Sequence, residues 1–398
     1  AILLLGVTQA AAAAVLPVAP DGTGPFATIA DALAAAAEGD SIVLAAGIYT
    51  GPGNRDLNPQ GLDVTITSAG GDPTTTVIDC EGTPGSPHRA FRFHQGESPN
   101  MTVAGLTIRG GYAAPNGGAV SCTGGSSPTF VSCRFLQNTA SQNGGALYCT
   151  SGAAPTFTDC EFSGNISYNY GGALRCYQAS ATFVRCLIQD SSSTSGGGLS
   201  YYRDCTAVIT DCVFTQNEGF SGGAVFAYDS VCDITGSTFT GNLALTDGGA
   251  IHGPDSEMTV TDCDFIGNEG NEHGGAVFFG GTGNKVLDGC TFRANWSPRG
   301  GALRSQFTTC EVTDCTFESN EGSLRGSSVD LYFSPAIFTR VIIAFGTATA
   351  AVHCEDGETV PVFTCSDIFG NAGGDWTGCI AEQAGDSGNI SADPWFCD

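Results

Sequence analysis

The sequence is poor in positive charge. Its 398 residues hold 14 Lys and Arg against 40 Asp and Glu, so the formal charge at pH 7 is −26, and Lys285 is the single lysine. A nucleic-acid-binding protein needs Lys and Arg to displace counterions from phosphates, so this composition excludes that class. Charged residues make up only 14% of the chain, which is too few for the outer faces of a helical bundle.

Long apolar segments are also scarce. No segment after residue 20 has the length and apolarity of a transmembrane helix. The hydrophobic fraction of 41% is nevertheless too high for a disordered acidic chain. Glycine is abundant, with 57 residues. The composition therefore favours a Gly-rich β protein with an acidic surface.

Cysteine is unusually frequent, with 18 residues. Unpaired thiols are a liability in the cytosol, so this number favours an oxidising compartment. The apolar residues 1–16 predict either a remnant of a secretory signal peptide or an ordered assembly segment. We therefore expect a secreted, extracellular or cell-surface protein without a membrane span.

A repeat of about 26 residues dominates the chain, and repeats of this kind decide the fold. Its first signature is Gly-Gly-Ala followed by an aliphatic residue. Together with variant copies at Gly196 and Gly326, these motifs are spaced 25 to 27 residues apart, and they begin at Gly117, Gly144, Gly171, Gly222, Gly248, Gly274 and Gly300.

Two further columns of residues run in phase with this motif. The first is phenylalanine, at Phe135, Phe162, Phe214, Phe239, Phe265, Phe292 and Phe317. The second is asparagine three residues later, at Asn138, Asn165, Asn217, Asn242, Asn268, Asn295 and Asn320. We expect both columns to form ladders in the core, in which each Asn amide donates to a carbonyl of the next coil.

Each repeat holds three short runs in which apolar residues alternate, which is the period of a β-strand. Between Phe157 and Cys160 the alternation breaks, so the chain must bend at Asp159. Asp and Gly predominate at the equivalent positions, and both tolerate a left-handed backbone. A second bend is expected at the Asn column. Three strands and three bends predict one coil of a solenoid, with about 12 or 13 coils stacked about 4.8 Å apart.

The Gly-Gly-Ala and Phe-x-x-Asn pair resembles the repeat of chlamydial polymorphic outer-membrane proteins. That family belongs to the right-handed parallel β-helices of the pectin-lyase-like superfamily. Residues 21–33, 39–44 and 47–49 are similar to the superfamily's N-terminal cap and first coil, with Thr28 as the helix N-cap, and residues 391–396 resemble the last coil of secreted β-helices. The resemblance implies an all-β right-handed parallel β-helix over 41–345, a cap with a short helix over 17–40, and less regular coils over 346–398.

The superfamily includes polysaccharide lyases and hydrolases, but their Asn-Thr-Asp, Asp-Asp, Gly-His-Gly, Trp-x-Asp-His and Arg-x-Pro-x-x-Arg signatures are absent. Catalysis is therefore not expected, and no catalytic, cofactor-binding or metal-binding residue is predicted. The remaining polar groups are interpreted as solvated turns between coils: His252 with Asp255, Arg203 with Asp204, and the acidic run 355–358. Bridging by calcium is conceivable from the acidity alone.

The cysteines leave two readings open. One column of them suits buried free thiols that act as small hydrophobes. Pairs separated by 10 or 11 residues, and one pair near the end of the sequence, suit disulfides. The candidates are Cys122 with Cys133, Cys149 with Cys160, Cys176 with Cys186, Cys354 with Cys365, and Cys379 with Cys397.

Two functional hypotheses follow. The first is a non-enzymatic structural or adhesive protein of the bacterial cell surface or extracellular matrix, which binds a host or matrix surface or assembles head to tail with itself into filaments. The alternative is a β-helix protein that binds or degrades polysaccharide. Aromatic side chains aligned on one outer face would favour the alternative; the candidates are Tyr168, Tyr170, Tyr177, Tyr201, Tyr202 and Tyr228.

Overall fold

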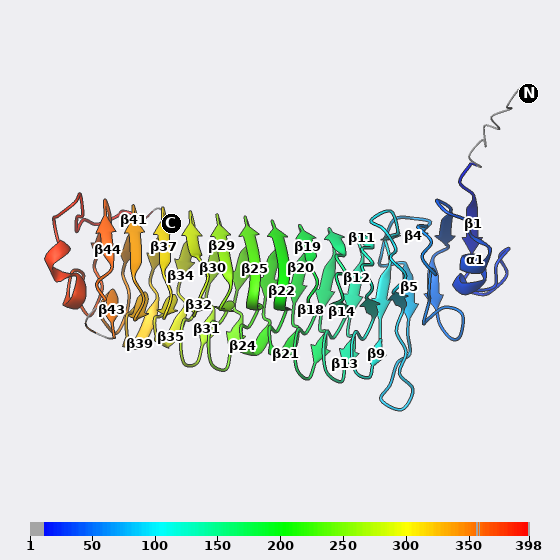
Figure 1. The fold of residues 1–398 in the computed structure, drawn as a ribbon, viewed down its shortest axis with the longest axis horizontal. Helices are drawn as coiled ribbons and strands as arrows, with labels where there is room; N and C mark the ends of the chain where they lie inside the picture. Colours follow the sequence, from blue (N-terminus) through cyan, green and yellow to red (C-terminus); the bar gives the residue numbers. More distant parts are fainter. Residues whose placement is uncertain (1–11, 356, 358, 397–398) are drawn as a thin grey trace, which may run out of the picture.

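A computed structural model shows a parallel β-solenoid, which Figure 1 presents as one long stack of coils. The structure describes residues 12–355, 357 and 359–396. The expected assembly segment at residues 1–16 therefore lies mostly outside the described residues. In the described part of the chain, one sheet has 23 strands, a second has 13 and a third has 9, and the strands of each pair in parallel across successive coils.

One coil illustrates the architecture. Strands β14 (Leu147–Thr150) and β15 (Thr156–Thr158) belong to the 23-stranded sheet, β16 (Glu161–Ser163) to the 13-stranded sheet, and β17 (Ile166–Ser167) to the 9-stranded sheet. Each pairs with its equivalent one coil away. Because the 13-stranded sheet takes one strand from each coil, its size agrees with the expected 12 or 13 coils among the described residues.

The predicted bends have the left-handed backbone that the sequence led us to expect. Asp159, Arg185 and Asp211 have φ angles of 54°, 50° and 53°. The second bend lies one residue earlier than predicted. It is Gln137 and Gln216, each immediately before an Asn, that adopt positive φ (both 54°). The Asn side chain is thereby left free to turn into the core.

The interior consists of stacked identical side chains. The rings of Phe135 and Phe162 lie parallel with centroids 4.8 Å apart, and the spacing along the Phe239–Phe265–Phe292 column is 4.8 and 4.7 Å. Beside them the Asn amides form a fully buried ladder. The Nδ2 of one Asn donates to the Oδ1 of the next, at 3.0 to 3.1 Å for Asn138, Asn217, Asn242, Asn268 and Asn295.

The Gly-Gly pair makes the tightest corner of each coil. Gly144 has φ +64°, and a Cβ there would overlap the carbonyl oxygen of Leu147. A Cβ on Gly145 would overlap the carbonyl oxygen of Gly172 in the next coil. Only glycine lets neighbouring coils approach this closely. The corner brings the residue before the glycines close to the strand that follows them.

Each end of the stack carries a short helix (Figure 1). Helix α1 (Ile29–Ala35) buries Ile29, Ala32 and Leu33 against the first coil, and the Oγ1 of Thr28 accepts a hydrogen bond from the backbone N–H of Asp31, as an N-cap does. At the other end the 3₁₀ helix η1 (Gly378–Gln383) buries Ile380. Within the described residues no helix is long and apolar enough to cross a lipid bilayer.

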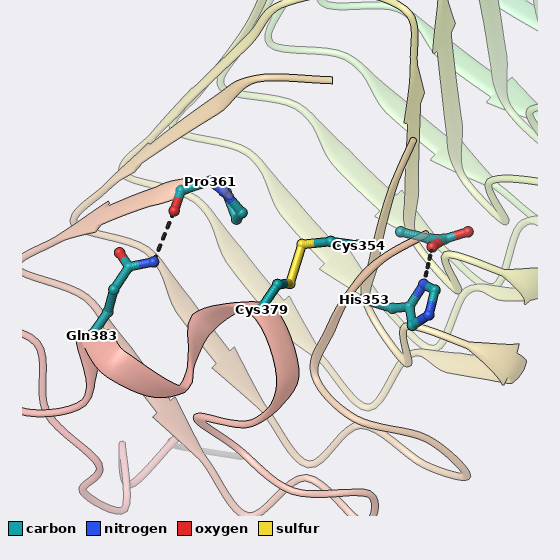
Figure 2. The surroundings of a disulfide bond; sticks show 6 residues. His353, Cys354, Pro361, Cys379 and Gln383 are labelled. Atoms are coloured by element: carbon teal, nitrogen blue, oxygen red, sulfur yellow. Dashed lines mark hydrogen bonds and ion pairs between the residues drawn. A yellow bond between two sulfur atoms is a disulfide. The ribbon is translucent and has the colours of Figure 1, made fainter. Parts of the chain in front are cut away.

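The expected disulfide pairs are wrong. The disulfide in the described residues joins Cys354 of β43 (Val352–Cys354) to Cys379 of η1, with Cα atoms 6.1 Å apart (Figure 2). Cys365, the expected partner of Cys354, is a free exposed thiol, and Cys397 lies outside the described residues. The remaining candidates are free and buried: Cys122, Cys133, Cys149, Cys160, Cys176 and Cys186.

The pairing fails because cysteines stack along the solenoid instead of facing each other within a coil. Cys122, Cys149 and Cys176 are neighbours in register on successive strands. They fill the core as small apolar side chains, which is the other reading of the sequence.

Candidate functional site

One outer surface of the solenoid differs from the rest in chemistry. We call it the GGA face. It consists of the residues that directly precede the Gly-Gly pairs and the outward residues of the strands that follow them. Those strands include β18 (Leu174–Tyr177), β22 (Leu199–Thr210), β25 (Val225–Thr235), β28 (Ile251–Pro254), β32 (Val277–Gly280), β36 (Leu303–Gln306), β40 (Val329–Tyr332) and β43.

Two columns of side chains run along this face. In the strands, parallel register aligns Tyr148, Arg175, Ser200, Phe226, His252, Phe278, Arg304, Asp330 and His353. In the corner, register aligns Asn143 with Tyr170 and Ser195, Asp247 with His273 and Arg299, and Arg299 with Arg325. Aromatic, cationic and titratable side chains therefore meet on one surface.

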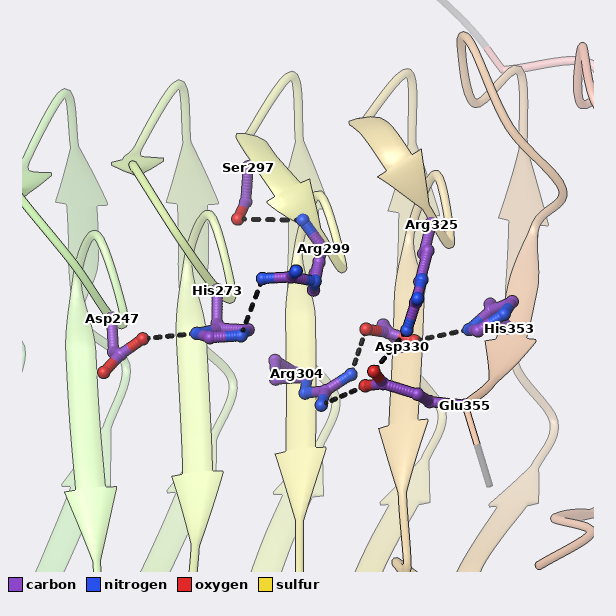
Figure 3. Close-up of polar contacts among 9 residues, drawn as sticks. All are labelled: Asp247, His273, Ser297, Arg299, Arg304, Arg325, Asp330, His353 and Glu355. Atoms are coloured by element: carbon purple, nitrogen blue, oxygen red, sulfur yellow. Dashed lines mark hydrogen bonds and ion pairs between the residues drawn. The ribbon is translucent and has the colours of Figure 1, made fainter. Parts of the chain in front are cut away.

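A histidine–aspartate pair occupies the middle of the corner column. The Nδ1 of His273 donates to the Oδ1 of Asp247 at 2.7 Å, and the Nη1 of Arg299 donates to the Nε2 of His273 at 3.2 Å (Figure 3). The carboxylate fixes the tautomer with the proton on Nδ1, so the lone pair of Nε2 points toward Arg299. The Nε of Arg299 is buried without a hydrogen-bond partner among the described residues.

A second charged network begins in the same coil as Arg299 (Figure 3). Arg304 is 2% exposed, and its guanidinium binds Asp330, which is fully buried, and the Oε2 of Glu355 at 2.7 Å. Asp330 also accepts from the Nδ1 of His353 at 2.8 Å, and Arg325 pairs with Glu355. Burial opposes ionisation of Glu355, but hydrogen bonds from Arg304 and Arg325 outweigh it and lower the pKa of this carboxyl.

His252 lies between two phenylalanines of its column. Its ring contacts those of Phe226 and Phe278 edge to face, with centroids 5.4 and 4.8 Å away. Burial lowers the pKa of His252 to about 4, and its Nδ1 has no hydrogen-bond partner among the described residues. The neutral imidazole is therefore the stable form near pH 7.

Tyrosines and arginines form the other half of the face. The rings of Tyr177, Tyr202 and Tyr228 stack on successive coils, with centroids 6.1 and 5.0 Å apart. Arg175 lies over the rings of Tyr170 and Tyr202, at 4.4 and 4.9 Å. Such cation–π contacts hold the rings and the guanidinium in one arrangement.

One group on the face has metal-ligand spacing. The ligand atoms of Asp247, Glu272 and His273 lie within 4.8 Å of one another. Both ring nitrogens of His273 already have protein partners, so a cation would have to displace Arg299 from Nε2. The arrangement as it stands suits proton transfer better than metal binding.

The structure separates the polar pairs that the sequence suggested. His252 is on the GGA face, whereas Asp255 lies in the following turn, where it accepts from the backbone N–H of Thr282 at 2.9 Å. Arg203 lies over the ring of Tyr202 at 5.2 Å. Glu355 binds two arginines instead of facing solvent in an acidic run.

The aromatic candidates divide into three groups. Four of them gather on the GGA face, namely Tyr170, Tyr177, Tyr202 and Tyr228. Tyr201 points into the core and is fully buried, and Tyr168 is 62% exposed and lines a shallow groove beside the 9-stranded sheet.

Sequence reasoning missed the titratable residues of this face: Asp247, His273, Arg299, Arg304, Asp330 and His353. A signal was present. Asp247, His273 and Arg299 directly precede a Gly-Gly pair, and Arg304 lies four residues after the first Gly of one, so aligning the repeats on Gly-Gly-Ala would have placed these four in two adjacent columns. Asp330 follows the variant copy at Gly326, and His353 follows no Gly-Gly pair.

Comparison with known proteins supports the fold. A family model described as "Right handed beta helix region" matches residues 93–244 and 220–379. No curated protein matches the chain.

Three solved structures illustrate the likeness. The first is a mannuronic acid-specific polysaccharide family 6 lyase from human gut microbiota, which is 12% identical in sequence. The alignment covers 96% of this chain and 91% of the lyase chain, with a TM-score of 0.47. The second is the catalytic unit of a GH87 α-1,3-glucanase from Streptomyces thermodiastaticus, which is 13% identical in sequence. The alignment covers 93% of this chain and 71% of the glucanase chain, with a TM-score of 0.44. The third is the A-module of a mannuronan C-5 epimerase from Azotobacter vinelandii, which is 12% identical in sequence. The alignment covers 92% of this chain and 94% of the epimerase chain, with a TM-score of 0.30.

The expectation that the chain is not an enzyme does not stand, because proteins named as enzymes are among those that share this fold, so the fold does not exclude catalysis. The three proteins are by name a lyase, a glucanase and an epimerase, which are enzymes that act on carbohydrate. At 12 to 13% identity the likeness concerns the fold. The chemistry of this chain has to be argued from its own side chains.

Proposed function

Because the chain belongs to the right-handed beta helix family, we propose that it is a secreted protein that binds polysaccharide along the GGA face and cleaves it there. The observation that carries this proposal is the concentration of chemistry on one surface. Arginines on other faces, such as Arg185 and Arg340, each pair with a single exposed carboxylate one coil away. On the GGA face arginines, tyrosines and histidine–aspartate pairs adjoin one another instead.

The shape of the face suits an extended polymer. Its columns run parallel to the solenoid axis, and successive coils repeat about every 4.8 Å, which is about the length of one sugar ring. A chain laid along the face would meet a new set of side chains at each sugar. Aromatic rings and planar guanidinium groups are suited to contacts with sugar rings and their polar substituents.

The Asp247–His273–Arg299 row supplies the reactive group. Asp247 holds the His273 proton on Nδ1, so once Arg299 turns to the substrate Nε2 can take a proton from the water that attacks the glycosidic carbon, and the imidazolium returns that proton to the oxygen of the departing sugar as the glycosidic bond breaks. Arg299 then stabilises the negative charge that develops as the proton leaves. Asp330 and Glu355 are both tied to arginines, so they are less available for this role.

The test is a screen of purified protein against neutral and acidic polysaccharides, with and without calcium, in which new reducing ends are measured. His273→Ala is expected to lower turnover by about 100-fold or more, the usual contribution of a general base. His88→Ala is the matched control, because His88 makes the same type of contact with Asp56, at 2.6 Å, seven coils away from His273. Equal losses in both variants, or no polysaccharide bound or cleaved by the parent protein, would refute the proposal.

Two predictions from the sequence remain untested. The likeness of the repeat to chlamydial polymorphic outer-membrane proteins rests on the motifs alone. Head-to-tail assembly depends on residues 1–16, of which residues 1–11 lie outside the described part of the chain.

A further inference from the structure

Arg175 is a buried cation without a carboxylate partner among the described residues. Its side chain is 4% exposed, and its one hydrogen bond to a described residue runs from Nη1 to the Oγ of Ser200, at 2.6 Å. Its guanidinium contacts the rings of Tyr170 and Tyr202, and burial lowers its pKa. A buried charge is costly unless an opposite charge or a full set of hydrogen bonds compensates it.

Most arginines of the described residues contact a carboxylate, and of those that do not, Arg89, Arg92, Arg203 and Arg299 are less buried than Arg175. Arg109, Arg185, Arg293 and Arg340, on other faces of the solenoid, each contact an Asp or Glu at 2.6 to 3.0 Å. With 40 acidic residues against 14 basic ones, an unpaired arginine is not a consequence of scarce carboxylates. No described Asp or Glu pairs with Arg175, although carboxylates are plentiful elsewhere in the sequence.

The surroundings of Arg175 hold it in place for a ligand. Its guanidinium lies over the rings of both Tyr170 and Tyr202, and the Tyr202 ring is itself stacked on those of Tyr177 and Tyr228. Arg203 adds a second cation over the ring of Tyr202, at 5.2 Å. Nε and Nη2 of Arg175 have no described acceptor, so two edges of the guanidinium fork remain for an anion.

We propose that Arg175, Tyr170 and Tyr202 form a subsite for an anionic sugar, whose carboxylate or sulfate group takes the unused donors of the guanidinium. This inference rests on the proposed function, since it assigns the charge of the polymer that the GGA face binds. A planar carboxylate presents two oxygens and a tetrahedral sulfate three terminal oxygens to the donor fork of Arg, and the tyrosine rings face the sugar beside it.

The subsite lies apart from the proposed reactive group. In the strand column, Ser200, Phe226 and His252 separate Arg175 from Phe278, which belongs to the coil of His273, so the separation is four coil steps or about 19 Å. A polymer bound at His273 therefore reaches Arg175 several sugars away. Arg175 contributes to affinity and to the choice of polymer, not to the bond-breaking step.

Binding is measured by titration calorimetry with three probes: polygalacturonate, which carries carboxylates, dextran sulfate, which carries sulfates, and neutral dextran. The proteins are the parent, Arg175→Gln, Tyr170→Ala and the control Arg185→Gln, whose arginine pairs with Asp159 on another face. We expect Arg175→Gln and Tyr170→Ala to weaken binding of a charged probe by about tenfold or more, the usual effect of losing a charge-assisted contact. Arg185→Gln should bind as the parent does.

The outcomes separate the two proposals. If the parent binds only neutral dextran, or if Arg175→Gln and Tyr170→Ala both retain full affinity for polygalacturonate and dextran sulfate, the anionic subsite is refuted while polysaccharide binding stands. If the parent neither binds nor cleaves any polysaccharide, the proposed function itself fails. Tyr170→Ala removes only a partly exposed ring, so it reports on the subsite even if Arg175→Gln does not fold. The charged probe that loses affinity identifies the group as carboxylate or sulfate.

Discussion

At the scale of single residues, the single lysine of the sequence lies in the buried core, where a charged group is costly. Lys285 points into the core and is fully buried, and its Nζ donates to the backbone carbonyls of Ser256 and Thr282. Burial lowers the pKa of Lys285 from its ordinary 10.5 to about 8, against the weaker influence of Asp255. The folded protein therefore holds this proton less tightly than the unfolded chain does.

This difference predicts how stability depends on pH. As the pH falls from 10.5 to 8 the unfolded chain takes up the proton while the folded protein does not, so the folded state loses stability. Relative to Lys285→Met, the parent should gain up to about 3 kcal/mol in free energy of unfolding between pH 8 and pH 10.5. Urea unfolding of both proteins across this range measures the difference. If the free energies of unfolding of the two proteins change in parallel with pH, Lys285 carries its proton in the folded state as it does in the unfolded chain.

Among elements, the Asn ladder joins neighbouring coils along much of the 13-stranded sheet. Asn268 follows strand β30 (Asp264–Ile266), and its Nδ2 donates to the carbonyl of Phe239 in the preceding coil and to Asn295 in the next one, at 2.9 and 3.0 Å. Its Oδ1 accepts two hydrogen bonds from Asn242. All of these groups are buried, so each would be costly to leave unpaired.

Removing one amide from the ladder should therefore be costly. We expect Asn268→Ala to lower the free energy of unfolding by about 3–5 kcal/mol, because buried donors and acceptors on two neighbouring coils lose their partner. Asn271→Ala is the control, since Asn271 lies in the same coil with its side chain exposed. Denaturant midpoints of the two variants give the comparison. A loss for Asn268→Ala no larger than for the control would mean that the ladder contributes nothing measurable.

The elements also show which part of the molecule the sequence could predict. The ladders and bends depend on one residue type at one position in every coil, so repetition of Phe, Asn and Asp made them visible before any coordinates. The GGA face depends on differences between coils. Tyr148, Arg175 and His252 occupy equivalent positions in register but share no chemistry, so no repeated letter marks the site.

The disulfide pairs were predicted wrongly for a related reason. Spacings of 10 or 11 residues suggested pairs within a coil, but Cys122 and Cys149 are neighbours between coils. The number of cysteines also favoured an oxidising compartment, whereas 15 of the described cysteines are free and most of them are buried. A thiol in this core serves as a small apolar side chain that fits a ladder, so the count alone carries little information on redox environment.

For the whole molecule, stability depends on the ends of the stack, because each coil contacts only its neighbours and a terminal coil has a neighbour on one side. At the C-terminal end, η1 buries Ile380, and the ring of Trp376 packs edge to face on Phe363 at 5.6 Å. The disulfide between Cys354 and Cys379 fastens this cap to β43 and closes a loop with a sequence separation of 25 residues (Figure 2). A closed loop of this size is expected to stabilise the cap by about 3 kcal/mol.

In a stack of this kind, loss of the disulfide should destabilise only the coils next to the cap. For the double variant Cys354→Ser and Cys379→Ser we expect faster amide hydrogen exchange in β43, β44 (Val362–Thr364), β45 (Asp367–Phe369) and η1, with unchanged protection in the central strands. Cys365→Ser is the control, because that thiol is exposed and unpaired. Exchange that accelerates equally along the whole solenoid would show instead that all coils unfold as one cooperative unit. The GGA face would then share its stability with the cap, and the proposed subsite at Arg175 would depend on a disulfide seven coils away.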